Sequence, residues 1–321
     1  MKNETMSLQL IDQTTPQDPD SLQSILDRIG EKLKADPGSP KEGAQNFVQR
    51  LQSAPREKTQ QCLSFVPTPM ARTSPFFPMS DREKKDRPHE TLRWKTSWGN
   101  IEVAGPRLSI FDEDVLLAIL ALLKGTQKKE ETTTEEGHQT YTIRTSGYAL
   151  CKYLGTPVGK NTYLSIEGAI DRMTATKVRL DITENSNGKK NAVFSMAGTI
   201  LSGWTWDRKT GELSVTLNPY FYETFKDGLL TYLDLTLRRR LQGDISKALL
   251  RFYESHQSNP AMHMLTIAQA INLRDMPPFR LKARLKNAFH ELKEIGYLKT
   301  SRIEKNGRVS IRKKNLPAVQ R

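Results

Sequence analysis

The chain has 321 residues, with 49 Lys+Arg against 36 Asp+Glu and a formal net charge of +13. This length suits two domains, or two domains with a tail. The positive charge favours an anionic partner, either nucleic acid or a membrane surface. The two cysteines, Cys62 and Cys151, exclude a disulfide framework and a CxxC zinc site.

The longest apolar run, residues 115–123, is about half the length that spans a bilayer. The first residues also lack the apolar core of a signal peptide. We therefore expect a soluble, cytoplasmic protein without membrane association. The five histidines form no His-x-His or HExxH pattern, and no GxSxG occurs. The sequence predicts no catalytic residue, no metal site and no cofactor, so we expect a protein that is not an enzyme.

The positive charge is concentrated near the end of the chain. Residues 271–321 carry 14 basic and 4 acidic side chains, whereas residues 1–58 carry 8 and 9. The basic segment keeps a regular apolar periodicity to about Lys314, which a disordered basic tail lacks. We therefore expect the charge to lie on a folded module.

Composition divides the chain into five parts. Residues 1–65 are polar and read as a flexible arm, and five prolines within residues 66–89 indicate an extended connector. From residue 90 the patterns become regular. We expect a first domain over residues 90–230, a second over residues 231–315 and a short tail over residues 316–321.

Both domains are expected to follow one plan of helix, short strand, helix, helix and β-hairpin. The expected helices and strands of the first domain cover residues 92–103, 112–124, 141–143, 146–154, 160–174, 177–183, 192–200, 213–217 and 218–226. Those of the second cover residues 244–256, 262–265, 266–273, 279–295, 297–303 and 309–313. Asn306-Gly307 favours a two-residue type I′ turn in the last hairpin. This order is typical of an α+β protein with tandem winged-helix domains, each a helix-turn-helix followed by a hairpin wing.

The helix expected at residues 279–295 carries the clearest binding signal. Leu281, Leu285, Ala288, Leu292 and Ile295 recur at spacings of 4, 3, 4 and 3 and form one apolar stripe. Outside the stripe lie basic and polar side chains that suit base edges in a major groove: Arg280, Lys282, Arg284, Lys286, Asn287 and His290. The following hairpin supplies cations for phosphates or a minor groove: Lys299, Arg302, Lys305, Arg308 and Arg312.

The equivalent helix of the first domain, residues 160–174, has a weaker signal. Lys160 and Asn161 could contact DNA, but Glu167 and Asp171 offset them. We place the wing turn of this domain at Asn187-Gly188-Lys189-Lys190, where Lys189 and Lys190 could contact DNA. Two roles stay open for the first domain, namely further DNA contact and a protein–protein surface such as a dimer interface.

With these elements placed, the sequence resembles the TrfA-type plasmid replication initiators, proteins of two winged-helix domains. The residues that carry the resemblance are Ala71–Phe77, Asp112–Leu116, Tyr148–Gly155, Gly159, Tyr163, Ile170–Thr176, Leu249–Tyr253 and Glu291–Leu298. The resemblance implies a non-catalytic initiator that binds repeated double-stranded DNA sites (iterons) at a plasmid origin. It also implies dimerisation and recruitment of a host initiator and helicase.

Two other functions remain open from the sequence. A winged-helix transcriptional repressor or autoregulator would show the same elements. A rolling-circle nicking enzyme would need a metal-bound His pair, which the histidine spacing does not provide.

A short segment before the first domain, Gln60–Phe65, fits the pattern Gln-x-x-Leu-x-Phe and is similar to the bacterial sliding-clamp-binding peptide. In that interpretation Gln60 hydrogen-bonds at a pocket rim, while Leu63 and Phe65 enter apolar pockets. The hypothesis requires both apolar side chains to be exposed.

Overall fold

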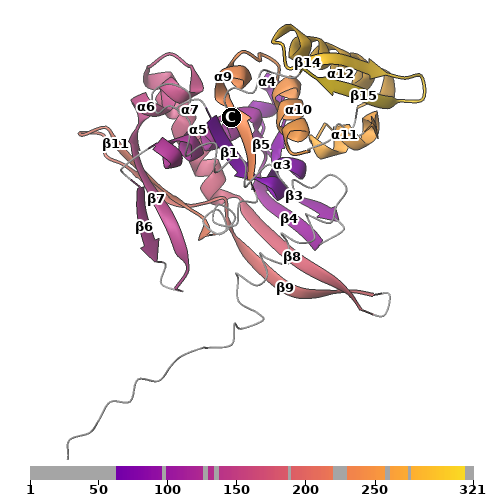
Figure 1. Ribbon diagram of the computed structural model, residues 1–321. Helices are drawn as coiled ribbons and strands as arrows, with labels where there is room; N and C mark the ends of the chain where they lie inside the picture. The colour runs from indigo at the N-terminus through magenta and orange to yellow at the C-terminus, as the bar shows by residue number, and fades with distance from the viewer. Residues whose placement is uncertain are drawn as a thin grey trace, which may run out of the picture.

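The computed structural model describes residues 63–95, 99–125, 129–133, 137–186, 189–219, 230–256, 261–273 and 276–314. Gln60, the arm at residues 1–62 and the tail at residues 316–321 lie outside these ranges. The described chain is a mixed helix and strand structure, in which helices occupy the upper part and two β-sheets extend below (Figure 1).

The first helix–hairpin unit begins with α5 and ends with β11. Its sheet has the strand order β10-β11-β7-β6, with each neighbouring pair antiparallel. Its elements are α5 (Ile110–Gly125), β6 (Lys129–Thr133), β7 (Gln139–Ser146), α6 (Gly147–Leu154), α7 (Lys160–Ala175), β10 (Leu201–Trp206) and β11 (Glu212–Leu217).

The second helix–hairpin unit repeats this arrangement closer to the end of the chain. Its sheet has the order β13-β15-β14, which matches β7-β11-β10 of the first unit position by position. Its elements are α10 (Asp244–Glu254), β13 (Met262–His263), α11 (Met264–Ala270), α12 (Pro278–Glu294), β14 (Leu298–Ile303) and β15 (Arg308–Lys313). The shared order of helix, strand, helix, helix and hairpin is therefore present in both units.

The match between the two sheets corrects the expected hairpin of the first unit. β8 (Lys177–Ser186) and β9 (Lys189–Thr199) belong with β4 (Gly99–Pro106) and β3 (His89–Lys95) to a separate sheet of order β3-β4-β8-β9, in which β8 pairs with β4. The hairpin that corresponds to β14–β15 is instead β10–β11. Lys189 and Lys190 thus lie in an inserted hairpin, because two extra strands separate α7 from its own β10.

The segment before β3 is folded, so the expectation of an extended connector at residues 66–89 is wrong. It contains β1 (Leu63–Pro67), α3 (Thr68–Arg72), β2 (Phe76–Phe77) and α4 (Asp81–Lys85). β1 pairs with β12 (Leu230–Asp234), which leads into α9 (Leu235–Arg239), while β2 pairs with β5 (Leu108–Ser109). The prolines interrupt longer elements without preventing packing.

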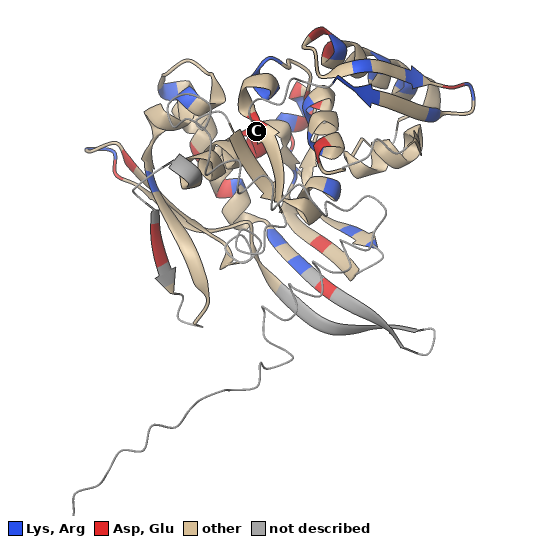
Figure 2. Cartoon of the chain, viewed as in Figure 1, with Lys and Arg blue, Asp and Glu red and all other residues tan. Residues whose placement is uncertain are grey.

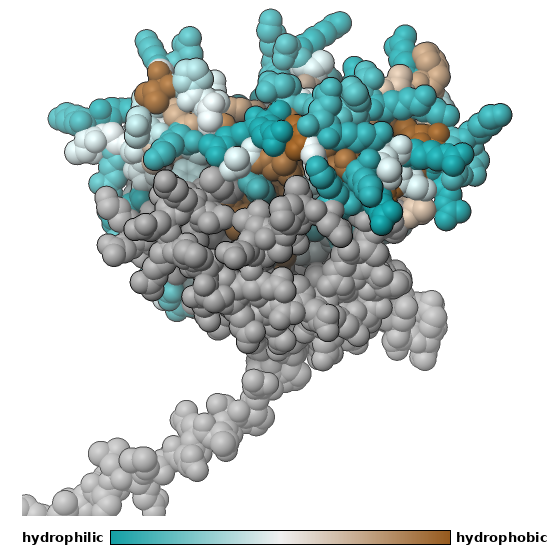
Figure 3. Space-filling view, turned by 45° about the horizontal axis from the view of Figure 1, so that its top comes forward, coloured by the Kyte–Doolittle hydropathy of each residue, from teal (hydrophilic) through white to brown (hydrophobic). Residues whose placement is uncertain are grey.

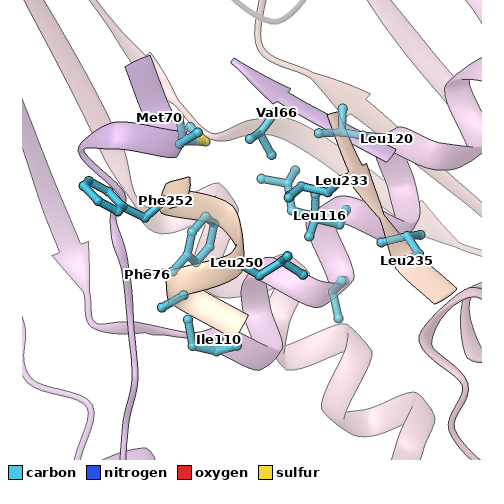
Figure 4. Packing of buried hydrophobic residues seen from close by; sticks show 14 of the residues in the cluster. Val66, Met70, Phe76, Ile110, Leu116, Leu120, Leu233, Leu235, Leu250 and Phe252 are labelled. Carbon is cyan, nitrogen blue, oxygen red and sulfur yellow. The ribbon is translucent and has the colours of Figure 1, made fainter. Parts of the chain in front are cut away.

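The core is centred on α5, whose residues Val115–Leu120 are almost wholly buried. A helix that is apolar on every side must be enclosed by other elements. β1, α6 and α7 surround α5, and α10 reaches it from the second unit. Figure 4 shows Val66, Leu116 and Leu250 converging in this cluster, so β1, α5 and α10 share one apolar core.

The first turn of α5 joins the two units through buried charge. Glu113 Oε2 lies 2.6 Å from Arg251 Nη1 on α10 and 3.1 Å from Arg238 Nη2 on α9. Asp114 pairs with Arg238 at 2.6 Å and with Lys247 at 2.7 Å. Burial acts to lower the pKa of Arg238, but the attraction of Glu113 and Asp114 outweighs it and raises that pKa.

The remaining acid of this turn faces the first unit. Asp112 pairs with Arg172 of α7 at 2.6 Å and with Arg87 at 2.7 Å. It also accepts a hydrogen bond from the backbone N–H of Ser109 at 2.6 Å. Three consecutive acids of α5 thus fix helices from both units relative to one another.

Candidate nucleic-acid interface

α12 separates an apolar side from a polar side, as its sequence spacing predicts. The buried residues are Leu281, Leu285, Ala288, Phe289 and Leu292. They pack the helix against α10, α11 and β14. The N-terminal part of the opposite face is exposed and basic, and it includes Arg280, Arg284, Lys286 and Asn287.

Two of the predicted binding residues on α12 have other contacts. Lys282 is half-buried, and its Nζ donates to the Glu304 carbonyl of the hairpin at 3.2 Å. His290 is exposed but lies 3.2 Å from the carboxylate of Glu294. The basic part of the face is therefore concentrated in the N-terminal half of α12, where recognition helices meet base edges.

Glu291 holds α12 in place from its inner side. Its carboxylate accepts hydrogen bonds from the backbone N–H groups of Gln242 and Gly243 and from the hydroxyl of Ser246. These groups form the N-terminus of α10, where a negative charge is stabilised by unpaired N–H groups and the helix dipole. The contact fixes the direction in which α12 presents its basic face.

The β14–β15 hairpin carries three arginines on one surface. Arg302 lies opposite Ser310, and Arg312 lies opposite Thr300. Since side chains alternate along a strand, Arg308 shares the face of Ser310 and Arg312. All three arginines are exposed, whereas Val309 and Ile311 point to the core. Figure 2 shows these cations along both strands of the hairpin.

The hairpin loop differs from the expected two-residue turn. Glu304 N–H donates to the Arg308 carbonyl at 2.8 Å, so Lys305, Asn306 and Gly307 form a three-residue loop. Gly307 has a φ of 84°, the left-handed conformation that such loops need at their last residue. Lys305 and Lys299 are exposed.

The loop is anchored to α11 by His263. Its Nδ1 accepts from the Leu265 N–H at 3.3 Å and caps α11, and its Nε2 lies 3.1 Å from the Asn306 carbonyl. The Gly307 carbonyl also accepts from Met264 N–H at 2.8 Å. Together with the contact from Lys282, these bonds place the hairpin tip beside α12.

The corresponding helix of the first unit, α7, has an exposed polar N-terminus. Lys160, Asn161 and Ser165 are exposed there. Of the two acids that offset them in the sequence, Glu167 lies 2.5 Å from Arg208, whereas Asp171 accepts a hydrogen bond from the neutral indole of Trp204 at 3.0 Å. The charge of Glu167 is therefore offset by Arg208, and that of Asp171 is not offset by its Trp204 contact.

The β10–β11 hairpin contains binding candidates that the sequence analysis missed. Arg208 and Lys209 are exposed in its turn, and the Arg208 guanidinium also lies 4.3 Å from the ring centroid of Trp206. The Thr210-Gly211 turn before β11 was a signal for this hairpin. The side chains of Lys189 and Lys190 are outside the described part of the structure.

The expected clamp-binding segment does not expose the apolar side chains that the hypothesis requires. Phe65 is 1% exposed and lies opposite Tyr232 in the β1–β12 pair, while Leu63 is half-buried. The prediction of an exposed Phe65 is wrong, because β12 supplies a partner strand from about 165 residues further along the chain.

Within the described ranges, no three His, Cys, Asp or Glu side chains are grouped to hold a metal ion. None of the described helices has the length and apolar character needed to cross a membrane. Figure 3 shows a largely hydrophilic upper surface with small apolar patches between polar side chains.

Comparisons with known proteins agree with this architecture. The family model of replication initiator protein A matches residues 70–262. A crystal structure of domains 2 and 3 of RctB, as the selenomethionine derivative, is similar with a TM-score of 0.52 at 14% identity. The similarity covers 77% of this chain and 98% of the RctB chain.

A second structure of RctB domains 2 and 3 has a TM-score of 0.46 at 14% identity, covering 74% of this chain and 94% of that one. No curated protein sequence matches. The family match spans more than half of the chain and agrees with the resemblance found in the sequence. The chain belongs to the replication initiator protein A family.

Proposed function

We propose that this protein is a plasmid replication initiator that binds repeated double-stranded DNA sites at an origin in the cytoplasm. The observation that carries the proposal is the repeated unit of three helices and a hairpin, whose second copy joins a basic helix face to a basic hairpin. We interpret both units as winged helices. In this interpretation α12 enters a major groove and β14–β15 lies along phosphates.

The side chains of α12 and of the β14–β15 hairpin suit different parts of the DNA. Arg280, Arg284 and Asn287 have the donors and acceptors that pair with guanine and adenine edges. Arg302, Arg308 and Arg312 form a cationic surface without the shape of a groove-reading helix, which suits phosphate contact. Affinity would then come mainly from the hairpin and specificity mainly from α12.

The first unit would bind the neighbouring part of the same site. Lys160 and Asn161 would meet the groove, and Arg208 and Lys209 would meet phosphates. The buried contacts of Glu113 and Asp114 support this arrangement, because they hold the two units at a set separation. Dimerisation through the first unit is the competing role.

The mechanism we propose makes and breaks no covalent bond. Binding energy would assemble several copies on repeated sites, favour opening of adjacent DNA and recruit a host initiator and helicase. Cleavage of origin DNA with magnesium or manganese would instead support a nicking enzyme. Binding without any requirement for the protein in replication would support a transcriptional repressor.

A plasmid-establishment assay tests the proposal. The DNA flanking this gene is placed on a circle with no other origin, and the protein is supplied separately. We expect replication with the wild-type protein and footprints at regular intervals close to the helical repeat. An Arg302→Ala/Arg308→Ala/Arg312→Ala variant should lose both. Footprints without replication would contradict the initiator function.

A further inference from the structure

Phe279 stands at the start of α12 with its side chain outside the core. It is 71% exposed, more than any other large hydrophobic side chain in the described ranges. Its helical neighbour Leu281 is almost fully buried, so the turn itself is packed. A phenylalanine left in water here adds nothing to the core.

The local structure holds Phe279 in this position. Pro277 and Pro278 precede it, and proline fixes the backbone angle φ of the first helical residues. The Arg280 guanidinium lies 5.7 Å from the ring centroid of Phe279. This distance is within the range of a cation–π contact. The ring is thus presented at the helix terminus beside a cation.

The side chains around Phe279 indicate the chemistry of its partner. One turn further along lie Lys282 and the small Ala283, followed by Lys286. The nearest acid along α12 is Glu291, which is turned toward α10. This surface is complementary to a polyanion, so the apolar group that Phe279 meets should belong to a polyanion.

In the major groove of DNA, the apolar group on the base edges is the thymine 5-methyl. We propose that Phe279 is a specificity-determining residue that contacts this methyl group in each repeated site. The inference rests on the proposed function, because it requires the N-terminus of α12 to enter the groove. The exposed Ala283 leaves room for the close approach.

The test uses a duplex selected by the full-length wild-type protein from a random pool. Each thymine of the selected site is replaced in turn by uracil, which lacks only the methyl group. Burial of one methyl group corresponds to about a 4-fold change in affinity. We expect uracil at one thymine position to weaken binding of the wild-type protein by about that factor.

Phe279→Ala should bind the thymine duplex more weakly and lose sensitivity to uracil at that same position. Leu164→Ala is the matched control, because Leu164 is an exposed apolar residue of α7. It should keep the uracil effect at the position assigned to Phe279. Equal melting temperatures of the variants would show that folding is unchanged.

Two results would overturn the inference while leaving DNA binding intact. One is an unchanged uracil penalty at the same position in Phe279→Ala. The other is a wild-type protein that tolerates uracil at every thymine, in which case the exposed ring serves a protein or a single strand. Failure of the wild-type protein to select any duplex would instead contradict the proposed function itself.

Discussion

Glu113 and Arg251 form a buried ion pair between the two helix–hairpin units, with 2.6 Å between Oε2 and Nη1. Both side chains are at most 1% exposed. Burial lowers the pKa of Arg251, and the attraction of Glu113 opposes that effect. Arg238, Asp114 and Lys247 surround the pair, so two acids and three cations meet at the junction.

Removing one partner of this pair should destabilise the protein strongly. Arg251→Met keeps much of the side-chain volume but leaves Glu113 with Arg238 as its remaining cation. Breaking a buried ion pair by removing one partner typically costs about 3–5 kcal/mol, and the remaining contact of Glu113 with Arg238 places this variant at the lower end. We expect a loss of about 3 kcal/mol in the free energy of unfolding, measured by urea denaturation.

The matched control is Arg93→Ala, which removes the exposed pair of Arg93 with Glu102. Exposed pairs contribute about 0–1 kcal/mol, because water and salt screen them. Equal losses in the two variants would show that the junction has no special role in stability.

Glu291→Ala should destabilise α10 at its N-terminus. The substitution removes the acceptor for two backbone N–H groups and the Ser246 hydroxyl. Loss of an N-terminal cap costs about 1–2 kcal/mol. Hydrogen exchange at the Gly243 amide should also become faster, because this N–H loses its acceptor. Glu294→Ala, which removes an exposed acid of the same helix, should change both quantities little.

Alkaline pH should destabilise the fold through buried tyrosines. Burial raises the pKa of Tyr232 from 10.0 to about 12. The folded state holds this proton more tightly than the unfolded state, so stability falls as pH rises from about 10 to about 12. The total effect is on the order of 3 kcal/mol.

Tyr232→Phe should reduce the slope of unfolding free energy against pH within that window. The slope below pH 9 should stay the same in both proteins. Parallel curves across the alkaline window would show that Tyr232 is not responsible. Burial also raises the pKa of Tyr253, so part of the slope should remain in the variant.

Gly307→Ala should disturb the hairpin loop in two ways. A Cβ atom there would lie 2.5 Å from Nε2 of His263, and the φ of 84° is unfavourable for alanine. We expect a loss of about 1–3 kcal/mol in the free energy of unfolding. In a His263→Ala/Gly307→Ala double variant the clash is absent, so the two losses should be less than additive. Full additivity would place the strain in the backbone alone.

Much of the helical framework was predictable from the sequence, because it depends on local periodicity. The α12 stripe, with Leu285 and Leu292 buried, follows directly from the 3.6-residue repeat. The first hairpin was assigned wrongly, because β8 and β9 have stronger turn signals than β10 and β11. Strand order depends on long-range pairing, which turn residues alone do not determine.

Long-range pairing also explains why the predictions from sequence were wrong near the start of the described chain. Phe65 looked like an exposed docking residue, since nothing near it in sequence covers it. Its partner Tyr232 is supplied by β12. The helix expected at residues 112–124 begins with the acids of α5, but the roles of these acids depend on cations such as Arg172 and Arg251. The pairing of Glu167 on α7 with Arg208 is likewise a long-range contact that composition does not show.

The cations on α12 and the hairpin divide into those that remain exposed and those with internal contacts. Lys313, for example, donates to the Tyr253 carbonyl at 2.8 Å and lies 3.3 Å from Glu254. If about 6–8 exposed cations meet phosphates, log affinity should fall against log salt with a slope of about −5 to −7. Arg308→Ala should reduce the magnitude of that slope by about 0.9 on any duplex.

In the proposed mode of binding, α12 reads base edges while the hairpin contacts phosphates. The most direct measurement is the affinity of Asn287→Ala for the selected repeat and for a random duplex, at one salt concentration. We expect a loss of about 10- to 100-fold on the repeat and little change on random DNA. Equal losses on the two duplexes would contradict base reading by α12.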